Sequence, residues 1–456
     1  CNARMPSPIA LEEDSEPVED AEMENMRAGT VESTLKRTDL TAEVRRALEI
    51  RAAVVQTSTA KFGTLIRAAD ADSRLRNTMQ FDGAQRTGRW SHKLFQPGNM
   101  MRPTLDGWVI EHGIVALKAG CPEMVVDNIT ELCANAVRGC IVAPPGRKLV
   151  QSDLANIEGR GLAYLAGEEW KLQAFRDFDA GTGPDLYKLA YARAFNVDPA
   201  DVGKGLQRQI GKVQELMLGY GGGVAAYLTG AMTYGIDLEV LADAVLATAS
   251  QEACDKAHAT WAWVVKKKRS LGLPEAVFVA CEILKSGWRA NHPATVQFWS
   301  ELETAVRKAI AVPGVAIDVG AHLRVRRDGA WLRIRLPSGR ALCYLNPLVE
   351  TDGQITYAGV NQYTHKWSRI KTYGGKLSEN VTQAFARDVL AGNADPAEQA
   401  GYEIVLSVHD ELLTETPDDP VYSAEELSEL MTKPLPWAPG LPLAAEGFET
   451  HRYRKG

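Results

Sequence analysis

Two aspartates stand at positions where a carboxylate is costly unless it binds something. Asp153 ends an apolar run in LVQSD, and Asp410 lies between two apolar runs in IVLSVHDELLTE. A carboxylate beside buried strands loses hydration energy unless it is paired or binds a cation. On adjacent strands, the two carboxylates could hold two divalent ions about 4 Å apart, which stabilises the attacking and leaving oxygens in phosphoryl transfer.

Each aspartate also has a purely structural interpretation. Asp153 precedes a helical pattern, and aspartate is a common N-terminal cap of a helix. Asp410 is equally well placed to be a turn residue in a β-hairpin. On the pattern alone, the structural and functional interpretations of both residues stay open.

The segment LQRQIGKVQELMLGYGGG would place a stripe of side chains, from cationic to apolar to aromatic, along one side of a helix. Two cationic residues, an apolar residue and a tyrosine follow one another at intervals of four positions. Because four residues advance about 400° on an α-helix, these side chains would lie along one side of the helix. These residues are Arg208, Lys212, Leu216 and Tyr220. The stripe could hold a triphosphate at one end and a sugar and base at the other. Composition alone favours the alternative, a solvated amphipathic helix with a glycine-rich end.

Periodicity indicates the elements that must position these residues. Apolar residues have helical spacing at 41–69, over most of 160–310 and at 376–390. Turn residues interrupt the 160–310 pattern near 181–185, 219–223, 272–274 and 287–293. Strand patterns occur at 144–159 before a helix start, at 321–345 as a hairpin with DG and SG turns, and at 403–417 as two strands meeting at HDE. Residues 81–103 are rich in Arg, Gly and amides and are expected to form a functional loop. The layout predicts a largely helical insertion between two halves of a strand-containing domain.

Composition excludes several classes of protein. The sequence is 45% hydrophobic and 24% charged, which is typical of a globular protein, and its 456 residues suggest two to four domains or subdomains. The net charge of −7 means that a polyanion must be met by local positive patches. No apolar run approaches the roughly 20 residues that cross a bilayer, so we expect no membrane partner. Seven scattered cysteines without a CxxC pair favour reduced thiols in the cytoplasm.

Five segments resemble motifs of the family A (Pol I-like) DNA polymerases. Their sequences are most similar to those of the phage and prophage branch. SDLANIEGR, RQIGKVQELMLGYGG and SVHDE resemble motifs A, B and C, in this order. TGRWSHKLFQPGN resembles the segment that follows the thumb, and GGKLSENVTQAFARDVL resembles the later helix that faces the minor groove. The resemblance implies an α+β right-hand fold with an antiparallel-sheet palm, mostly helical fingers and a short helical thumb.

The resemblance runs from about residue 42 to residue 456 and implies domain boundaries. These are an acidic lead-in at 1–40, a reduced thumb at 41–80, palm at 81–165, fingers at 166–315 with the motif B helix at 206–220, and palm again at 316–456. The acidic start has no strand-embedded DxE, so we expect no 3′→5′ exonuclease in this chain. A separate exonuclease or a processivity factor is an expected partner, and the implied location is the cytoplasm of a bacterial or phage-infected cell.

The implied reaction adds dNTPs to the 3′-hydroxyl of a primer on template DNA and releases pyrophosphate. Asp153 and Asp410 would bind two Mg²⁺ ions, for which Mn²⁺ can substitute, with the Leu154 carbonyl as a further ligand. Arg208 and Lys212 would bind the triphosphate and stabilise charge on the leaving group.

The resemblance assigns the remaining site residues to the sugar, the base pair and the primer–template. Glu158 would exclude a 2′-hydroxyl, and Tyr220 would pack near the nascent base pair. Arg89 and Gln383 would sense the minor groove. His409 and Glu411 would flank Asp410 beside the primer terminus.

Three positions depart from the family pattern. Leu216 stands where Phe or Tyr is usual, which predicts slower incorporation through loss of an aromatic contact. Tyr187 occupies the place of a triphosphate-contacting His; its phenol can donate a hydrogen bond but brings no positive charge. Glu379 stands where an Asn usually precedes Gln383 by one turn, so that role is not carried over.

Two other functions have to be weighed against DNA synthesis. A single-subunit RNA polymerase shares the architecture, but Glu158 and the HDE triplet argue against it. A catalytically silent primer–template binding protein would not require Asp153, Lys212 and Asp410 together.

Two basic clusters lie outside these motifs. The run Lys266–Arg269 is expected to be a solvated helix face rather than a DNA contact. Alternation in the 321–345 hairpin puts arginines on one face, either as a phosphate-facing stripe or as a solvated outer face. They are Arg324, Arg326, Arg333 and Arg335.

Overall fold

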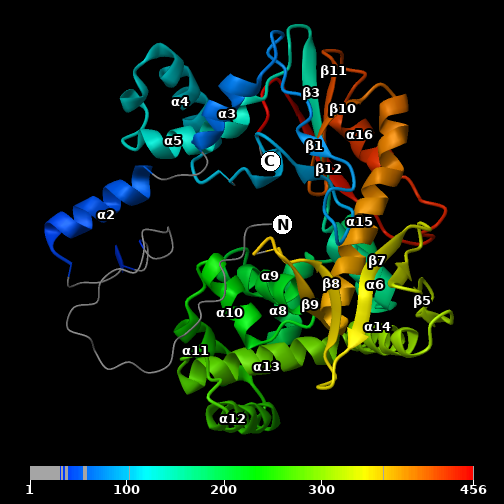
Figure 1. Ribbon diagram of the computed structural model, residues 1–456. Coiled ribbons are helices and arrows are strands. Elements are labelled where there is room, and N and C mark those ends of the chain that lie inside the picture. Colours follow the sequence, from blue (N-terminus) through cyan, green and yellow to red (C-terminus); the bar gives the residue numbers. More distant parts are fainter. Residues whose placement is uncertain are drawn as a thin grey trace.

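The computed structural model describes residues 31, 34–35, 40–54, 59–101, 103–362 and 364–454, and it has a mixed α+β fold (Figure 1). The acidic lead-in predicted at 1–40 lies almost entirely outside the described residues. Among the described helices, none has both the length and the apolar composition needed to span a bilayer.

A four-stranded antiparallel sheet joins one strand from near residue 150 to three strands from the last part of the chain. Its order is β10 (Glu403–Val408), β11 (Glu411–Pro417), β3 (Arg147–Leu154) and β12 (Ala445–Thr450). Both faces of β3 are covered, since Val150 joins the main core and Leu149 joins a second cluster with Phe95 and Leu413. The predicted strands at 144–159 and 403–417 are therefore confirmed, and they pair with each other.

Helices fill the chain between β3 and the next sheet, as predicted. They are α6 (Ile157–Ala166), α7 (Glu169–Asp179), α8 (Leu186–Phe195), α9 (Leu206–Leu218), α10 (Val224–Thr233), α11 (Leu238–Thr248), α12 (Gln251–Lys266), α13 (Glu275–Asn291) and α14 (Pro293–Ala311), with a 3₁₀ turn at Pro199–Asp201. The break expected near 287–293 is present at His292, between α13 and α14. One detail of the prediction is wrong: α9 ends at Leu218, so Tyr220 lies beyond the helix.

A second sheet of six antiparallel strands follows α14 in simple sequential order. Its strands are β4 (Ala316–Val319), β5 (Leu323–Asp328), β6 (Trp331–Arg335), β7 (Ala341–Val349), β8 (Ile355–Val360) and β9 (Trp367–Thr372). The predicted hairpin with its DG and SG turns is confirmed, but β8 and β9 were not predicted. Strand β8 is buried continuously over Ile355–Tyr357 and therefore lacks the alternation that indicates a half-buried strand.

Helix α15 (Gly374–Gln399) crosses between the two sheets and is longer than the predicted 376–390 (Figure 1). It packs against α6, α14 and α16 (Ala424–Met431), so most of its circumference is buried. A separate helical group near the start contains α2 (Ala42–Val54), α3 (Ala60–Ala68), α4 (Gly107–Ala119) and α5 (Ile129–Ala136). Short elements complete this part: β1 (Met79–Gln80), β2 (Ser91–His92), and 3₁₀ turns at Pro97–Asn99, Pro122–Met124 and Val137–Cys140.

A buried ion pair holds α9 in the helical body. The Lys171 ammonium of α7 forms an ion pair with the Glu215 carboxylate, and both side chains are more than nine-tenths buried. Trp288 Nε1 donates a second hydrogen bond to Glu215 at 3.0 Å. Burial alone would raise the pKa of Glu215, but the charge of Lys171 holds this pKa well below its usual value. Glu215 therefore stays ionised in the core and depends on Lys171.

Replacing Lys171 with Met leaves the Glu215 charge without its main partner. We expect Lys171→Met to lower the free energy of unfolding by about 3–5 kcal/mol, as measured by urea denaturation. The matched control is Lys256→Met, because Lys256 forms an exposed ion pair with Glu252 at 2.6 Å on α12. The control should leave the urea midpoint unchanged. Equal midpoints for the wild type and Lys171→Met would contradict this role of the pair.

Candidate active site

Strand pairing brings Asp153 and Asp410 together. Asp153 lies opposite Glu411 in the register of β3 and β11, and the Leu154 amide donates to the Asp410 carbonyl at 3.0 Å. Asp410 occupies the turn between β10 and β11, as its structural interpretation predicted. The N-cap of α6 is Asn156, so Asp153 does not cap that helix.

Burial and neighbouring carboxylates disfavour the charged form of Asp410. Burial, together with the negative charges of Glu158 and Asp153, raises the pKa of Asp410 to about 6 against the opposing charge of Arg89. A divalent cation would relieve this repulsion, and oxygen donors are the ligands that Mg²⁺ and Mn²⁺ prefer. No group of three or more metal-binding side chains occurs in the described part of the chain. Two carboxylates fit an ion such as Mg²⁺, which usually keeps waters and takes further ligands from substrate phosphates.

Arg89 and Tyr220 hold Glu158 beside this pair. The Arg89 guanidinium forms an ion pair with Glu158 and lies 3.6 Å from an Asp410 oxygen. Tyr220 donates to the other Glu158 oxygen at 3.2 Å, and burial, with the charge of Glu158, raises the pKa of Tyr220 well above 10. Arg89 Nη1 is buried and has no hydrogen-bond partner among the described residues. The cluster therefore keeps one donor available for a ligand.

A cleft of about 350 Å³ lies next to the cluster. Arg89, Gln383 and His409, three of the residues predicted to contact DNA, all line it. Arg86, Lys376 and Arg387 add positive charge, and Glu379 adds a carboxylate. His409 is exposed in the turn before Asp410, with a left-handed φ of 59°. The structure thus gathers these residues from the 81–103 loop, α15 and the β10–β11 turn.

Glu411, the fourth residue predicted to contact DNA, is fully buried. Its carboxylate accepts a hydrogen bond from the Tyr453 hydroxyl at 2.7 Å, and Arg138 donates to the same hydroxyl at 2.9 Å. Sequence patterns gave no signal for Arg138 or Tyr453, because they lie far from the motifs and act through one tertiary contact. The hydroxyl orients Glu411 beside Asp153 in the sheet.

Helices α8 and α9 carry a second group of predicted site residues. Arg208 donates to Asp185 at 2.7 Å and lies 5.0 Å from the centre of the Tyr187 ring. Burial raises the pKa of Tyr187 to about 12, so the phenol stays protonated. Gly211 allows α9 to pack closely against α8, because an added Cβ would lie 1.9 Å from the Tyr187 carbonyl oxygen.

The remaining members of the predicted stripe lie on the same helix. Lys212 has its Nζ 4.7 Å from the centre of the Tyr234 ring. Leu216, one turn further along α9, is half-buried. Arg208, Lys212 and Leu216 therefore share α9, whereas Tyr220 joins the Glu158 cluster after the helix has ended.

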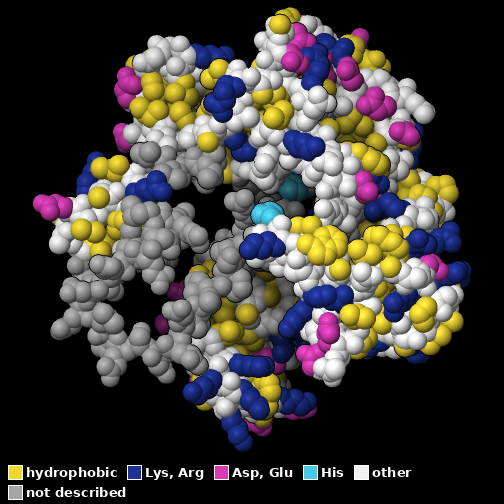
Figure 2. Space-filling model, in the orientation of Figure 1, with side chains coloured by type: hydrophobic (Ala, Val, Ile, Leu, Met, Phe, Trp, Pro, Cys, Tyr) yellow, Lys and Arg dark blue, Asp and Glu magenta, His cyan; other side chains and the backbone are white. Residues whose placement is uncertain are grey.

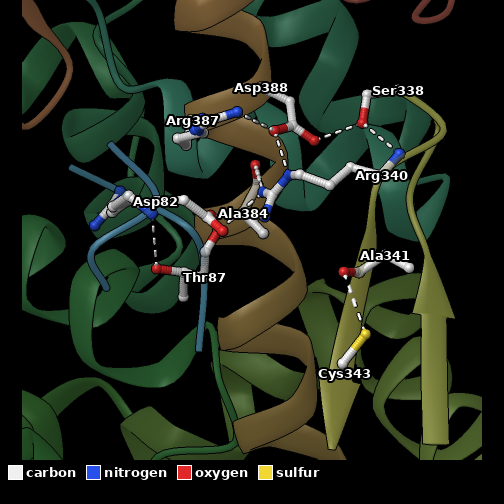
Figure 3. Close-up of polar contacts among 10 residues, drawn as sticks. Asp82, Thr87, Ser338, Arg340, Ala341, Cys343, Ala384, Arg387 and Asp388 are labelled. Carbon is white, nitrogen blue, oxygen red and sulfur yellow. Dashed lines mark hydrogen bonds and ion pairs between the residues drawn. The ribbon is translucent and has the colours of Figure 1, made fainter. Parts of the chain in front are cut away.

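Arg340 ties the 81–103 loop to α15 and to the β6–β7 turn, a link that sequence reasoning missed (Figure 3). It donates to the carbonyl oxygens of Thr87 and Ala384 at 2.9 and 3.0 Å, and to the Asp388 carboxylate at 2.8 Å. Ser338 donates to the other Asp388 oxygen at 2.5 Å. Because Thr87 precedes Arg89 by two residues, this network supports the backbone that carries Arg89.

Comparisons with known proteins bear on the family and the fold of this chain. No family model matches the chain. It is 33% identical over 422 residues to the DNA polymerase of Bacillus phage SP02, a match that covers 90% of this chain and 57% of that protein. A shorter match, 34% identical over 85 residues, covers 19% of this chain and 8% of DNA polymerase I from Chloroflexus aurantiacus.

The fold is also that of a solved polymerase domain. The POL domain of Pol1 from M. smegmatis, solved with DNA primer-template and dNTP, superposes with a TM-score of 0.54 and 15% identity over 94% of this chain and 56% of that one. The described fold is thus that of a polymerase domain. The chain belongs to the family A, Pol I-like DNA polymerases, with a phage enzyme among its relatives, and it spans a little over half the length of that relative.

The Arg340 network can be tested without an activity assay. Arg340→Lys cannot reach both carbonyl oxygens and Asp388 together, so we expect a loss of about 1–3 kcal/mol in the free energy of unfolding. Arg335→Lys, on the exposed face of the same hairpin, is the matched control and should change it by less than about 0.5 kcal/mol. Equal losses in the two variants would contradict the supporting role of Arg340.

Proposed function

We propose that this chain is a template-directed DNA polymerase that adds dNTPs to a primer 3′-hydroxyl and releases pyrophosphate. The observation that most supports this proposal is the position of Asp153, on β3, next to Asp410, in the turn before the paired strand β11, with the Arg89–Glu158 ion pair beside them. The phage relative is named a DNA polymerase, and the solved neighbour binds primer-template and dNTP, which supports the proposal.

The right-hand layout is part of this proposal. The four-stranded sheet would form the palm, α7 to α14 the fingers, and the helices before residue 81 a reduced thumb. The six-stranded sheet lies within the second palm segment proposed at 316–456. A processivity factor and a separate exonuclease stay predictions from the sequence.

Asp153 and Asp410 would hold two Mg²⁺ ions, or Mn²⁺, with the Leu154 carbonyl as a further ligand. Bound there, the ions would lower the pKa of the primer hydroxyl and stabilise the transition state. Arg89, Gln383 and His409 would contact the primer–template from the adjoining cleft, and Glu411, held by Tyr453, would support the turn that carries Asp410.

Residues on α8 and α9 would bind the incoming nucleotide. Arg208 and Lys212 would bind the triphosphate, and Tyr187 would donate a hydrogen bond to it. Because Arg208 is bonded to Asp185, phosphate oxygens would have to replace that carboxylate when α9 moves toward the palm. Glu158, held by Arg89 and Tyr220, would occupy the space that a 2′-hydroxyl needs.

Removing one carboxylate charge tests the central chemistry. We expect Asp410→Asn to extend a labelled primer at least about a hundredfold more slowly than the wild type, with primer–template binding retained. The wild type should use dNTPs and not rNTPs. Extension with rNTPs alone would indicate an RNA polymerase, and tight binding without extension by the wild type would indicate a silent binding protein.

Leu216 provides a test of the nucleotide-binding helix. An aromatic ring at this position would gain a stacking contact near the nucleotide, so Leu216→Phe should incorporate dNTPs roughly 2–10-fold faster in single-turnover measurements. Leu228→Phe, on neighbouring α10, is a control for a general effect of added volume. A wild-type rate equal to or above that of Leu216→Phe would contradict this role.

A further inference from the structure

The six-stranded sheet has one buried and one open face. Leu323, Val325, Leu332 and Ile334 belong to the main core, and α14 packs against β4 to β7. The open face carries six cations and two tryptophans, and in Figure 2 basic and apolar side chains lie next to each other over this sheet. They are Arg324, Arg326, Arg333, Arg335, Arg369, Lys371, Trp331 and Trp367.

Four of these cations face each other directly across two strands. The register pairs Arg324 with Arg335 and Arg326 with Arg333. Like charges directly opposite each other in a sheet are destabilising. The pairing therefore has a cost that an anionic ligand on this face would offset.

Nearby carboxylates neutralise the face only in part. Asp318 lies 2.6 Å from Arg324, and Asp328 is shared between Arg326 at 2.7 Å and Arg333 at 3.2 Å. Glu350 lies 3.8 Å from Arg369, so among the described residues three carboxylates form ion pairs on a face with six cations. These ion pairs are exposed and weak, so phosphate groups can replace them at little cost.

The two tryptophans add flat apolar surface to the same face. Trp331 is 41% exposed and Trp367 is 65% exposed. The register places Trp331 in a row with Leu345, Ala358 and Arg369, and Trp367 follows on the same side of β9. Strands lie about 4.8 Å apart, so the row spans about 14 Å from Trp331 to β9. Exposed aromatic rings among cations are the surface on which unpaired bases stack while the backbone meets positive charge.

We propose that this open face binds single-stranded DNA, with Trp331 and Trp367 stacking on bases and the arginines contacting phosphates. Stacking on a side chain requires unpaired bases, which favours a single strand over a duplex. The choice of strand rests on the proposed function: in a DNA polymerase, the single strand available is the template beyond the primer terminus.

The test compares binding to two primer–templates that differ only in the length of the 5′ template overhang. Fluorescence anisotropy without dNTPs would measure affinity for overhangs of 2 and 20 nucleotides. We expect the wild type to bind the long overhang more tightly, and Trp331→Ala/Trp367→Ala to lose about tenfold or more on the long overhang only. Arg324→Gln/Arg333→Gln should reduce the slope of log affinity against log salt by about 0.7 for each arginine.

A matched control removes the same kinds of side chain from another surface. Trp263 is 53% exposed on α12, and Lys266 and Lys267 are exposed at the end of that helix. Trp263→Ala/Lys266→Gln/Lys267→Gln should bind both DNAs like the wild type. Circular dichroism would show that all variants are folded.

Two outcomes would overturn the proposal. The first is wild-type binding that does not depend on overhang length. The second is an equal loss on short and long overhangs in the open-face variants, which would assign the face to the duplex. Because the assay needs no turnover, failure of primer extension would contradict the proposed function and leave this binding result intact.

Discussion

The antiparallel pairing of β3 with β11 is the constraint on which the candidate site depends. It places Asp153 opposite Glu411 and next to Asp410, although helices α6 to α14, the six-stranded sheet and α15 separate the two strands in sequence. A shift of one residue would turn Asp153 to the other face of the sheet. Hydrophobic clusters cover both faces of β3, with Val150 in one and Leu149 in the other, so the register is strongly specified by burial.

The other elements supply charge to this pair and restrain it. The 81–103 loop brings Arg89 to Glu158 and Asp410, and Arg340 connects the same loop to α15 through the Thr87 carbonyl. The Glu215–Lys171 ion pair anchors α9, which carries Arg208 and Lys212. Site geometry therefore depends on contacts between segments that are distant in sequence, and the six-stranded sheet takes part through the β6–β7 turn.

Much of this arrangement could be predicted, and the misses have physical causes. The motif strands were predictable because apolar runs and turn residues mark β3, β10 and β11 locally. Strand β8 was missed because it is buried continuously over Ile355–Tyr357, so its burial does not alternate. The Arg340–Asp388 link and the Tyr453–Glu411 hydrogen bond depend on tertiary contacts that no spacing encodes. The resemblance, rather than periodicity, identified Arg89 and Gln383.

Counting bound Mn²⁺ by electron paramagnetic resonance would test the central claim most directly, because it observes the ions themselves. The sample is the full chain with primer–template and a dNTP analogue that cannot be hydrolysed. The wild type should bind two Mn²⁺ ions per chain, Asp153→Asn/Asp410→Asn should lose both, and the exposed-site control Asp318→Asn should keep both. If the double variant kept both ions, Asp153 and Asp410 would not be the metal ligands and the proposed mechanism would be wrong.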